Sequence, residues 1–140
     1  MNKERQAPRD TAATPDTAPL VGHEDTRTGL GVDALKRAFL DKLVYVQARF
    51  PEVATRRDCF QALAGTVRDR LLHRWVQTAR TYRVEGSRTV CYMSAEFLIG
   101  PQLGNNLINL GIFENARQAM KELGLDLDAL IEEEEEPGLG

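Results

Sequence analysis

The chain has 140 residues, of which 42% are hydrophobic and 28% charged, as in ordinary soluble domains. Its net charge of −3 gives no overall attraction to nucleic acid or to an anionic membrane surface, so neither is an expected partner. No apolar run approaches the roughly 18 residues that span a bilayer, and the opening MNKERQAPRD lacks a signal-peptide pattern. We therefore expect a cytoplasmic protein.

The charge is distributed unevenly along the chain. Residues 55–90 carry eight arginines against three acids, a net of +5, whereas residues 112–140 carry nine acids against two basic residues, a net of −7. The arginine-rich stretch lacks interleaved aromatic residues, which favours a solvated or interdomain surface over a nucleic-acid face. The acidic run Glu132–Glu136 would oppose the dipole of a preceding helix, so we expect it to fray or remain solvated.

Few chemical signatures are present. The two cysteines, Cys59 and Cys91, have no metal-ligand spacing and lie in apolar surroundings, which favours two buried free thiols. We find no phosphate-binding P-loop, no HExxH, no GxSxG and no His/Cys cluster, so no metal site is predicted.

Residues 1–31 are predicted to form a disordered N-terminal tail. They contain Pro8, Pro15 and Pro19, no aromatic residue and few large aliphatic residues. Such a composition cannot bury enough apolar surface to offset the entropy of ordering. The folded part is therefore expected to begin at Val32.

The first predicted helix runs from about Val32 to Phe50. Its apolar stripe consists of Leu35, Phe39, Leu43, Val46 and Phe50, at spacings of four, four, three and four. Asp33 suits the first turn, and Pro51 is expected to end the helix because the residue before a proline leaves the α region.

A second helix is predicted from Thr55, as its N-cap, to about Tyr82. Its apolar stripe is formed by Phe60, Ala64, Val67, Leu71 and Trp75. The arginines that fall largely on other faces are Arg56, Arg57, Arg68, Arg70, Arg74 and Arg80. A glycine in a helix costs roughly 1 kcal/mol against alanine if exposed, so we expect Gly65 to pack closely against a neighbour.

The run Thr89–Met93 is short, β-branched and aromatic, which predicts a strand buried on both faces. A lone strand is not a stable sheet. Two alternatives follow: a helical chain with one extended segment, or a strand whose partners lie outside this sequence. The expected fold class is mainly α with one short strand.

Three shorter helices are predicted after Gly100 and Pro101. They comprise Leu103 to Leu110 with Gly111 at its end, Phe113 to Leu123 closed by Gly124, and a last turn or two with Leu127, Leu130 and Ile131 after Asp126. We expect Asp126 to act as the N-cap of the last of these helices.

The segment 88–111, RTVCYMSAEFLIGPQLGNNLINLG, places a strand pattern, a glutamate, a glycine turn and a helix in an uncommon order. It resembles a block near the N-terminus of the α-glucan phosphorylases, which act on glycogen, starch or maltodextrin. That block reads Tyr-[Leu/Met/Ile]-Ser-x-Glu-Phe-x-x-Gly followed by Leu-x-Asn-Asn-Leu-x-Asn-Leu. The resemblance extends back to about Leu72 and forward to Gly140, roughly the second half of the chain.

The resemblance implies a glycosyltransferase that cleaves terminal α-1,4-linked glucose with inorganic phosphate to give glucose 1-phosphate. It implies two Rossmann-like domains in the GT-B arrangement, of which residues 32–140 would be an incomplete N-terminal domain, and a homodimer. It also implies pyridoxal 5′-phosphate, held by a lysine Schiff base in the C-terminal domain, whose 5′-phosphate acts on the substrate phosphate. On this reading Lys3, Lys36, Lys42 and Lys121 are not the cofactor lysine.

One side chain is assigned to the substrate through this resemblance. Glu96 matches the glutamate near the glucosyl site, where a carboxylate can accept hydrogen bonds from sugar hydroxyls; a structural ion pair is the alternative. Gly138, Leu139 and Gly140 match the start of a glycine-rich loop that faces the substrate phosphate. Leu98 stands where the animal enzymes have tyrosine, and Pro101 where many members have arginine, which weakens the expectation of a polar contact at those two positions.

No catalytic, cofactor-binding or metal-binding residue is predicted within the 140 residues, so the chain alone is expected to be inactive. The alternative is a non-catalytic helical module that uses the phosphorylase-like block to assemble with a partner. This reading has a weakness, because an unpaired strand of the buried type promotes aggregation unless another element covers it.

Overall fold

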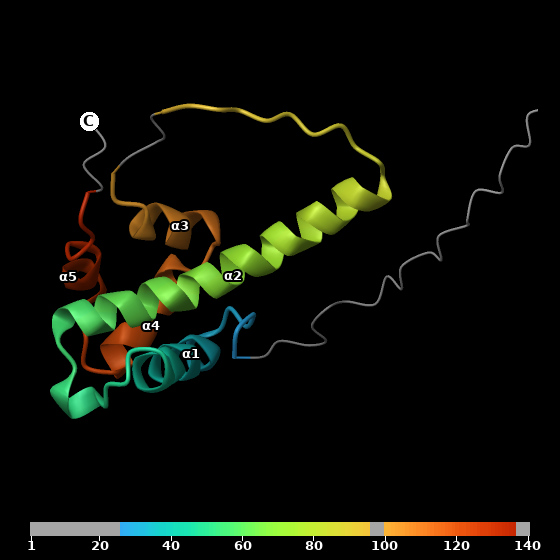
Figure 1. The fold of residues 1–140 in the computed structure, drawn as a ribbon. Helices are drawn as coiled ribbons and strands as arrows, with labels where there is room; N and C mark the ends of the chain where they lie inside the picture. Colours follow the sequence, from blue (N-terminus) through green and yellow to red (C-terminus); the bar gives the residue numbers. More distant parts are fainter. Residues whose placement is uncertain (1–25, 96–99, 137–140) are drawn as a thin grey trace, which may run out of the picture.

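The computed structural model describes residues 26–95 and 100–136, and within these ranges the chain is helical. The elements are α1 (Val32–Tyr45), the 3-10 helix η1 (Pro51–Val53), α2 (Arg56–Val84), α3 (Leu103–Asn109), α4 (Phe113–Glu122) and α5 (Leu127–Ile131). Figure 1 shows α2 as the long element along which the other helices gather at one end.

The first helix ends earlier than predicted. α1 buries Leu35, Phe39 and Leu43, as the stripe predicts, but stops at Tyr45. Beyond it the chain turns back, with the Arg49 amide donating to the Leu43 carbonyl and Ala48 in a left-handed conformation (φ +52°). Val46 and Phe50 are therefore exposed, and the prediction that they continue the buried stripe is wrong. The turn of residues 46–50, and not Pro51, terminates the helix.

The second helix begins as predicted. The Thr55 hydroxyl accepts from the Asp58 amide at 3.2 Å, and the Asp58 carboxylate accepts from the Thr55 amide at 2.9 Å. This reciprocal capping box satisfies two of the amides that a helix start leaves without partners. The helix then runs for 29 residues to Val84, slightly past the predicted end.

The buried face of α2 differs from the predicted stripe. It consists of Cys59, Ala62, Leu63, Thr66, Val67 and Arg70. Of the predicted stripe only Val67 is fully buried, and Trp75 is 66% exposed. The reason is that α2 contacts α1, α3 and α5, so its buried face is wide over the first half, whereas the second half extends beyond the other helices (Figure 1).

A buried arginine on this face is the clearest departure from the sequence prediction. Arg70, expected on an outer face, is 2% exposed. Its guanidinium donates to the Gly29 carbonyl at 2.6 and 2.9 Å and to the Thr66 carbonyl at 2.8 Å. Since a buried arginine needs acceptors for its five donors, these carbonyls explain how it is accommodated. Arg70 thereby fixes the chain just before α1 against α2.

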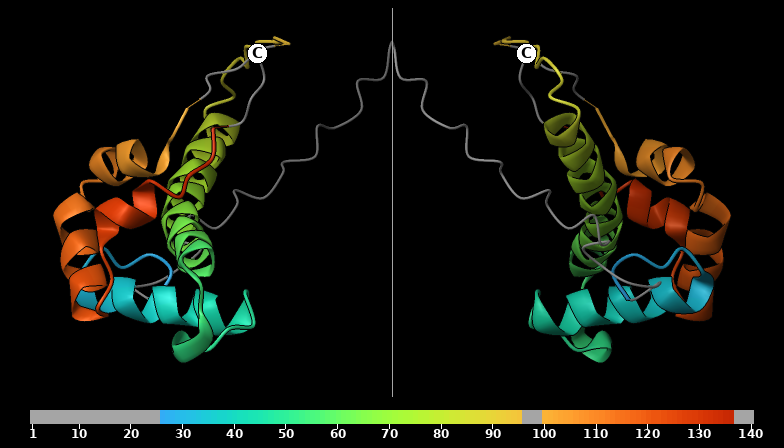
Figure 2. Two further views of the ribbon diagram at one scale, coloured as in Figure 1. Left: turned by 90° about the vertical axis from the view of Figure 1, so that its left-hand side faces the viewer. Right: turned by 90° about the vertical axis from the view of Figure 1, so that its right-hand side faces the viewer.

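The structure confirms the three short helices that were predicted after Pro101, which are α3, α4 and α5. Gly111 and Gly124 follow α3 and α4 with φ of +72° and +75°, the left-handed conformation that ends helices. The Asp126 carboxylate accepts from the Asp128 amide at 3.1 Å and so caps α5. Figure 2 shows α3, α4 and α5 gathered on one side of α2, with α1 crossing at the base of the group.

The helices enclose one core. Its larger side chains are Leu35, Phe39, Leu43, Leu63, Val67, Leu107, Ile112, Met120, Leu127 and Leu130. Aliphatic side chains dominate this core, as expected from a chain in which only 6% of residues are aromatic. Gly65 lies beside the Lys42 side chain, where an added Cβ would sit 3.5 Å from Cδ, which confirms that it faces a neighbour.

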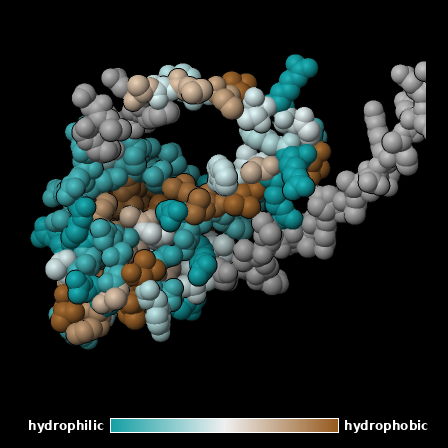
Figure 3. Space-filling view, in the orientation of Figure 1, coloured by the Kyte–Doolittle hydropathy of each residue, from teal (hydrophilic) through white to brown (hydrophobic). Residues whose placement is uncertain are grey.

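The predicted strand is not formed. Residues 89–93 are extended but belong to no sheet, and no strand occurs within residues 26–95 or 100–136. Val90 is 92% exposed, and Tyr92 and Met93 are also exposed, in the chain segment that arches over the top of Figures 1 and 3. A strand requires a neighbouring backbone for its amides and carbonyls. β-Propensity without such a neighbour does not produce one, so the described fold is helical.

Candidate functional site

The residues assigned to the substrate by resemblance lie outside the described part of the chain. These are Glu96, together with Gly138, Leu139 and Gly140. Leu98 lies outside it as well, whereas Pro101 is described and exposed. Their assignment therefore stays a prediction, and the structure describes only the residues next to these segments, Gly100 on one side and Glu136 on the other.

Gly100 and Glu136 line the same pocket. It has a volume of about 410 Å³, and its lining consists of Arg57, Phe60, Gly100, Gln102, Glu134, Glu135 and Glu136. Two stretches that are more than thirty residues apart in the sequence thus meet over the first turns of α2. The chain neighbours of both predicted substrate segments are brought together at one place.

Arg57 is the cation of this pocket. Its guanidinium donates to the Glu135 carboxylate at 2.9 Å and to the Glu133 backbone carbonyl at 3.4 Å. It also lies over the Phe60 ring, 5.7 Å from the centroid, in a cation–π arrangement. The adjacent Arg56 forms a longer ion pair with Glu133, at 3.5 Å.

Glu134 makes a different kind of contact. Its carboxylate accepts from the Leu103 backbone amide at 2.7 Å. Leu103 is the first residue of α3, and the side chain of Gln102, the N-cap residue, donates to the Gly100 carbonyl at 3.2 Å and does not cap the helix. A carboxylate at a helix start is favoured both by the free amide and by the helix dipole.

The prediction that the acidic run frays or stays solvated holds only in part. α5 ends at Ile131 and the Glu135 side chain is 79% exposed, as predicted, whereas Glu133 and Glu134 are partly buried and contact other elements. The unfavourable dipole at the end of α5 is offset by Arg56, Arg57 and the start of α3. Sequence reasoning placed the arginines on outer faces and did not pair them with these acids. The available signal was charge complementarity between the first turn of α2 and a run of five glutamates.

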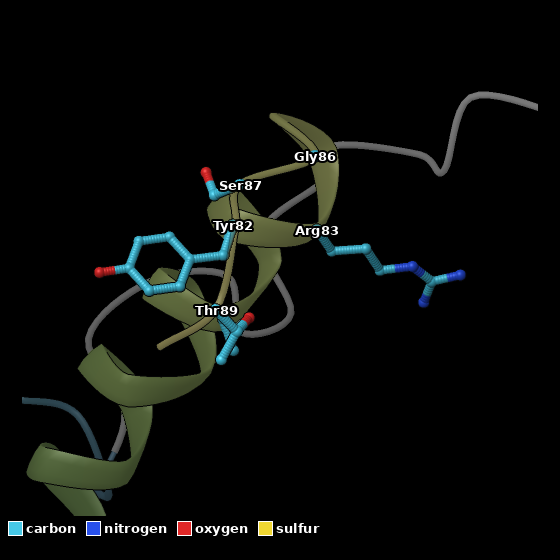
Figure 4. Close-up of a pocket in the computed structure, with 6 residues that line it drawn as sticks. Tyr82, Arg83, Gly86, Ser87 and Thr89 are labelled. Carbon is cyan, nitrogen blue, oxygen red and sulfur yellow. The ribbon is translucent and has the colours of Figure 1, made fainter. Parts of the chain in front are cut away.

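A second pocket of about 430 Å³ lies at the far end of α2. Its lining is Ala79, Tyr82, Arg83, Gly86, Ser87 and Thr89. Figure 4 shows the Tyr82 and Arg83 side chains pointing to opposite sides of the helix end. Arg83 is the one charged group in this lining, so the pocket holds no acid–base pair of its own.

Two of the three described lysines, Lys36 and Lys42, form ion pairs. Lys36 lies 2.6 Å from Glu122, and this hydrogen bond raises the pKa of Lys36 and lowers the pKa of Glu122. Lys42 lies 2.9 Å from Asp69. The side chains of Lys36 and Lys42 are thus both engaged by carboxylates.

The cysteines differ from each other in exposure. Cys59 is buried, and loss of hydration raises the pKa of its thiol, so it is an unreactive core residue. Cys91 is exposed, so the prediction of two buried thiols is wrong for Cys91. Within residues 26–95 and 100–136 no group of three metal-binding side chains occurs, and no helix there is long and apolar enough to cross a membrane.

Comparison with known proteins gives several related chains. Glycogen phosphorylase of Synechocystis sp. is 60% identical over 124 residues, which cover 89% of this chain and 15% of that protein. Glycogen phosphorylase of Haemophilus influenzae is 42% identical over 114 residues, covering 81% and 14%. The brain form of human glycogen phosphorylase is 42% identical over 113 residues, covering 80% and 13%. No model of a known protein family matches the chain.

These matches extend over four fifths or more of the chain, far beyond the block that first suggested the resemblance. The chain belongs to the glycogen phosphorylase family, as a segment from its N-terminal part, which confirms the resemblance seen in residues 88–111. It spans about one seventh of the length of these curated relatives.

Proposed function

We propose that this chain is the helical N-terminal segment of an α-glucan phosphorylase with the GT-B arrangement. The whole protein removes a terminal α-1,4-linked glucose from glycogen or maltodextrin with inorganic phosphate. In that reaction the C1–O4 glycosidic bond breaks, a phosphate oxygen bonds to C1, and the departing O4 gains a proton. The observation that carries this proposal is the 60% identity to a glycogen phosphorylase over 124 residues.

Glu96 is proposed to bind the glucosyl unit, and Gly138, Leu139 and Gly140 to begin a loop facing the substrate phosphate. A carboxylate accepts hydrogen bonds from sugar hydroxyls, and successive backbone amides in a glycine-rich loop donate to phosphate oxygens. The meeting of Gly100 and Glu136 at one pocket supports this assignment, because it allows both segments to serve one substrate.

Pyridoxal 5′-phosphate is proposed as the cofactor of the whole protein, held in its C-terminal domain. For two of the three described lysines, Lys36 and Lys42, the ion pairs with carboxylates support a cofactor lysine elsewhere. We assign no step of the reaction in this segment to the cofactor. A homodimer and a cytoplasmic location are proposed with it.

A second candidate function is a non-catalytic helical module. The observation that favours it is the helical core, which the described residues close by themselves, with an exposed apolar segment at Val90, Tyr92 and Met93 left for a partner. On this reading Glu96 has no substrate to bind.

Enzyme kinetics of the full-length protein distinguish the phosphorylase from the non-catalytic module. We expect phosphate-dependent formation of glucose 1-phosphate from maltodextrin, and Glu96→Gln should lower kcat/KM by about 100-fold, the range of one lost transition-state contact. Glu85→Gln is the matched control, because Glu85 is exposed at the end of α2 and should leave kcat/KM unchanged. Equal effects of the two substitutions would refute the role of Glu96. Absence of any phosphorolysis would favour the module.

A further inference from the structure

Two stretches of the chain are fastened to each other and to α2 by a small set of polar contacts. The stretches are 100–103, which leads into α3, and 133–136, which follows α5. Glu134 joins them directly through the Leu103 amide, at 2.7 Å. Arg57 of α2 holds the second stretch through the Glu133 carbonyl and the Glu135 carboxylate.

Within residues 26–95 and 100–136, the Glu134 carboxylate is the side chain seen to cap α3, a helix of seven residues. Such a short helix has little intrinsic stability, so the direction of its first turn depends on contacts with other elements. Leu103 and Leu107 are buried in the core beneath it, which fixes one face of the helix. The carboxylate of Glu134 fixes its beginning.

The Arg57 contacts act on the other stretch. The guanidinium fork lets one side chain donate to a backbone carbonyl and to a carboxylate two residues further on. The contact with the Glu133 carbonyl fixes the path of the 133–136 stretch, and the contact with the Glu135 carboxylate fixes the orientation of the guanidinium. Phe60, one turn further along α2, lies against the same guanidinium.

We propose that Arg57 and Glu134 are positioning residues, which hold the 100–103 and 133–136 stretches in a fixed relation over the first turns of α2. This inference rests on the proposed function, since these stretches adjoin the segments to which Glu96 and Gly138–Gly140 belong. Neither residue needs to touch substrate. They act by fixing the positions of the chain ends from which the two adjoining segments start.

Such a role differs from a contribution to stability. The Arg57 side chain is 43% and the Glu135 side chain 79% exposed, and ion pairs this open contribute little to folding. Displacement of reacting groups by about 1 Å can nevertheless lower a rate by about 100-fold. Substitutions here should leave the fold intact while changing local protection and catalysis.

The experiment uses the full-length protein with Arg57→Met and Glu134→Ala. Arg68→Met is the matched control, because Arg68 is exposed on the same helix and has no ion pair among the described residues. Hydrogen exchange of a peptide covering residues 100–110 is measured by mass spectrometry, alongside kcat and KM for phosphorolysis. Circular dichroism verifies that the helical content is unchanged.

We expect Glu134→Ala to speed exchange at the start of α3 by about tenfold or more, since the Leu103 amide loses its acceptor. Glu134→Gln, which keeps an acceptor oxygen, should restore most of the protection. Arg57→Met should lower kcat/KM by about tenfold or more without loss of helical content, and Arg68→Met should not. The double exchange Arg57→Glu with Glu135→Arg should recover part of that loss.

Unchanged exchange in Glu134→Ala would overturn the role of Glu134. Equal kinetics for Arg57→Met and Arg68→Met would overturn that of Arg57. If the full-length protein shows no phosphorolysis, the proposed function fails, and the exchange measurement still decides whether Glu134 holds α3.

Discussion

Arg70 is the residue whose role depends most on its surroundings. It is buried in a helical core and donates to the carbonyls of Gly29 and Thr66. Arg70→Met preserves much of the apolar stem but removes the guanidinium donors of the Gly29 carbonyl, whereas the Thr66 carbonyl keeps its helical hydrogen bond. Because buried unsatisfied acceptors and lost charged hydrogen bonds are costly, we expect a loss of about 2–4 kcal/mol in the free energy of unfolding. Urea denaturation of the 140-residue chain measures it.

Arg68→Met is the control for this prediction. Arg68 is exposed two residues earlier on the same helix, so its substitution should change the free energy of unfolding by less than about 0.5 kcal/mol. A similar, small effect of both substitutions would show that the buried hydrogen bonds of Arg70 contribute nothing net.

The contribution of Asp58 to the stability of the start of α2 depends on pH. Its hydrogen bonds from the Thr55 amide and hydroxyl, and then its charge interaction with Arg49, lower its pKa below the ordinary value of 3.8. A carboxylate whose pKa is lower in the folded state stabilises the fold above its unfolded pKa and loses this contribution as the pH falls. Asp58→Asn should therefore destabilise the chain at neutral pH.

The difference between the wild type and Asp58→Asn should shrink as the pH falls from 3.8 through the lower folded pKa. Chemical denaturation at a series of pH values measures this difference. A difference that is constant across the acid range would mean that ionisation of Asp58 is not what stabilises the helix start.

At the scale of helices, replacing Gly65 with alanine should increase the stability of the fold. It lies inside α2, and an added Cβ would meet the Lys42 Cδ at 3.5 Å, an ordinary contact distance. Gly65→Ala is expected to raise the free energy of unfolding by about 0.5–1 kcal/mol, because alanine restricts the unfolded chain and favours helix.

Gly111→Ala is the opposite case and serves as the control. Nothing lies within 4 Å of its added Cβ, but its φ of +72° is strained for alanine. We expect a loss of about 1 kcal/mol at this position. Thermal denaturation of both variants separates the effect of room for a Cβ from the effect of backbone conformation. A lower stability of Gly65→Ala would contradict the contact distances given for Gly65.

The helix starts and ends were predictable where single residues determine them. Thr55 and Asp126 as caps, and Gly111 and Gly124 as terminators, act through local hydrogen bonds and backbone conformation. Other features depend on distant elements. The buried face of α2, for example, is determined by its contacts with α1, α3 and α5.

The same limit applies to the predicted strand and to the site. β-Branched composition at residues 89–93 expresses a preference that only a neighbouring strand can satisfy, and the described chain provides none. The contacts of Arg57 join residues over 70 positions apart, and that of Glu134 joins residues over 30 positions apart, so no local pattern contains them. Glu96 and Gly138–Gly140 were found by resemblance and lie beyond the described residues.

At the scale of the whole molecule, the chain is a self-enclosed helical group with an exposed apolar segment at residues 89–93 and a pocket where two loops meet. The chain corresponds to about one seventh of the length of its relatives, and we propose that it supplies part of a site that the rest of the protein completes. On our account it orders loops for chemistry that is completed by the rest of the protein.

The most direct test of this account is the stoichiometry of the full-length protein acting on maltodextrin. We predict that one glucose 1-phosphate forms for each inorganic phosphate consumed, that no free glucose appears, and that the 140-residue chain alone forms neither. Release of free glucose without consumption of phosphate, or no reaction at all by the full-length protein, would contradict the assignment.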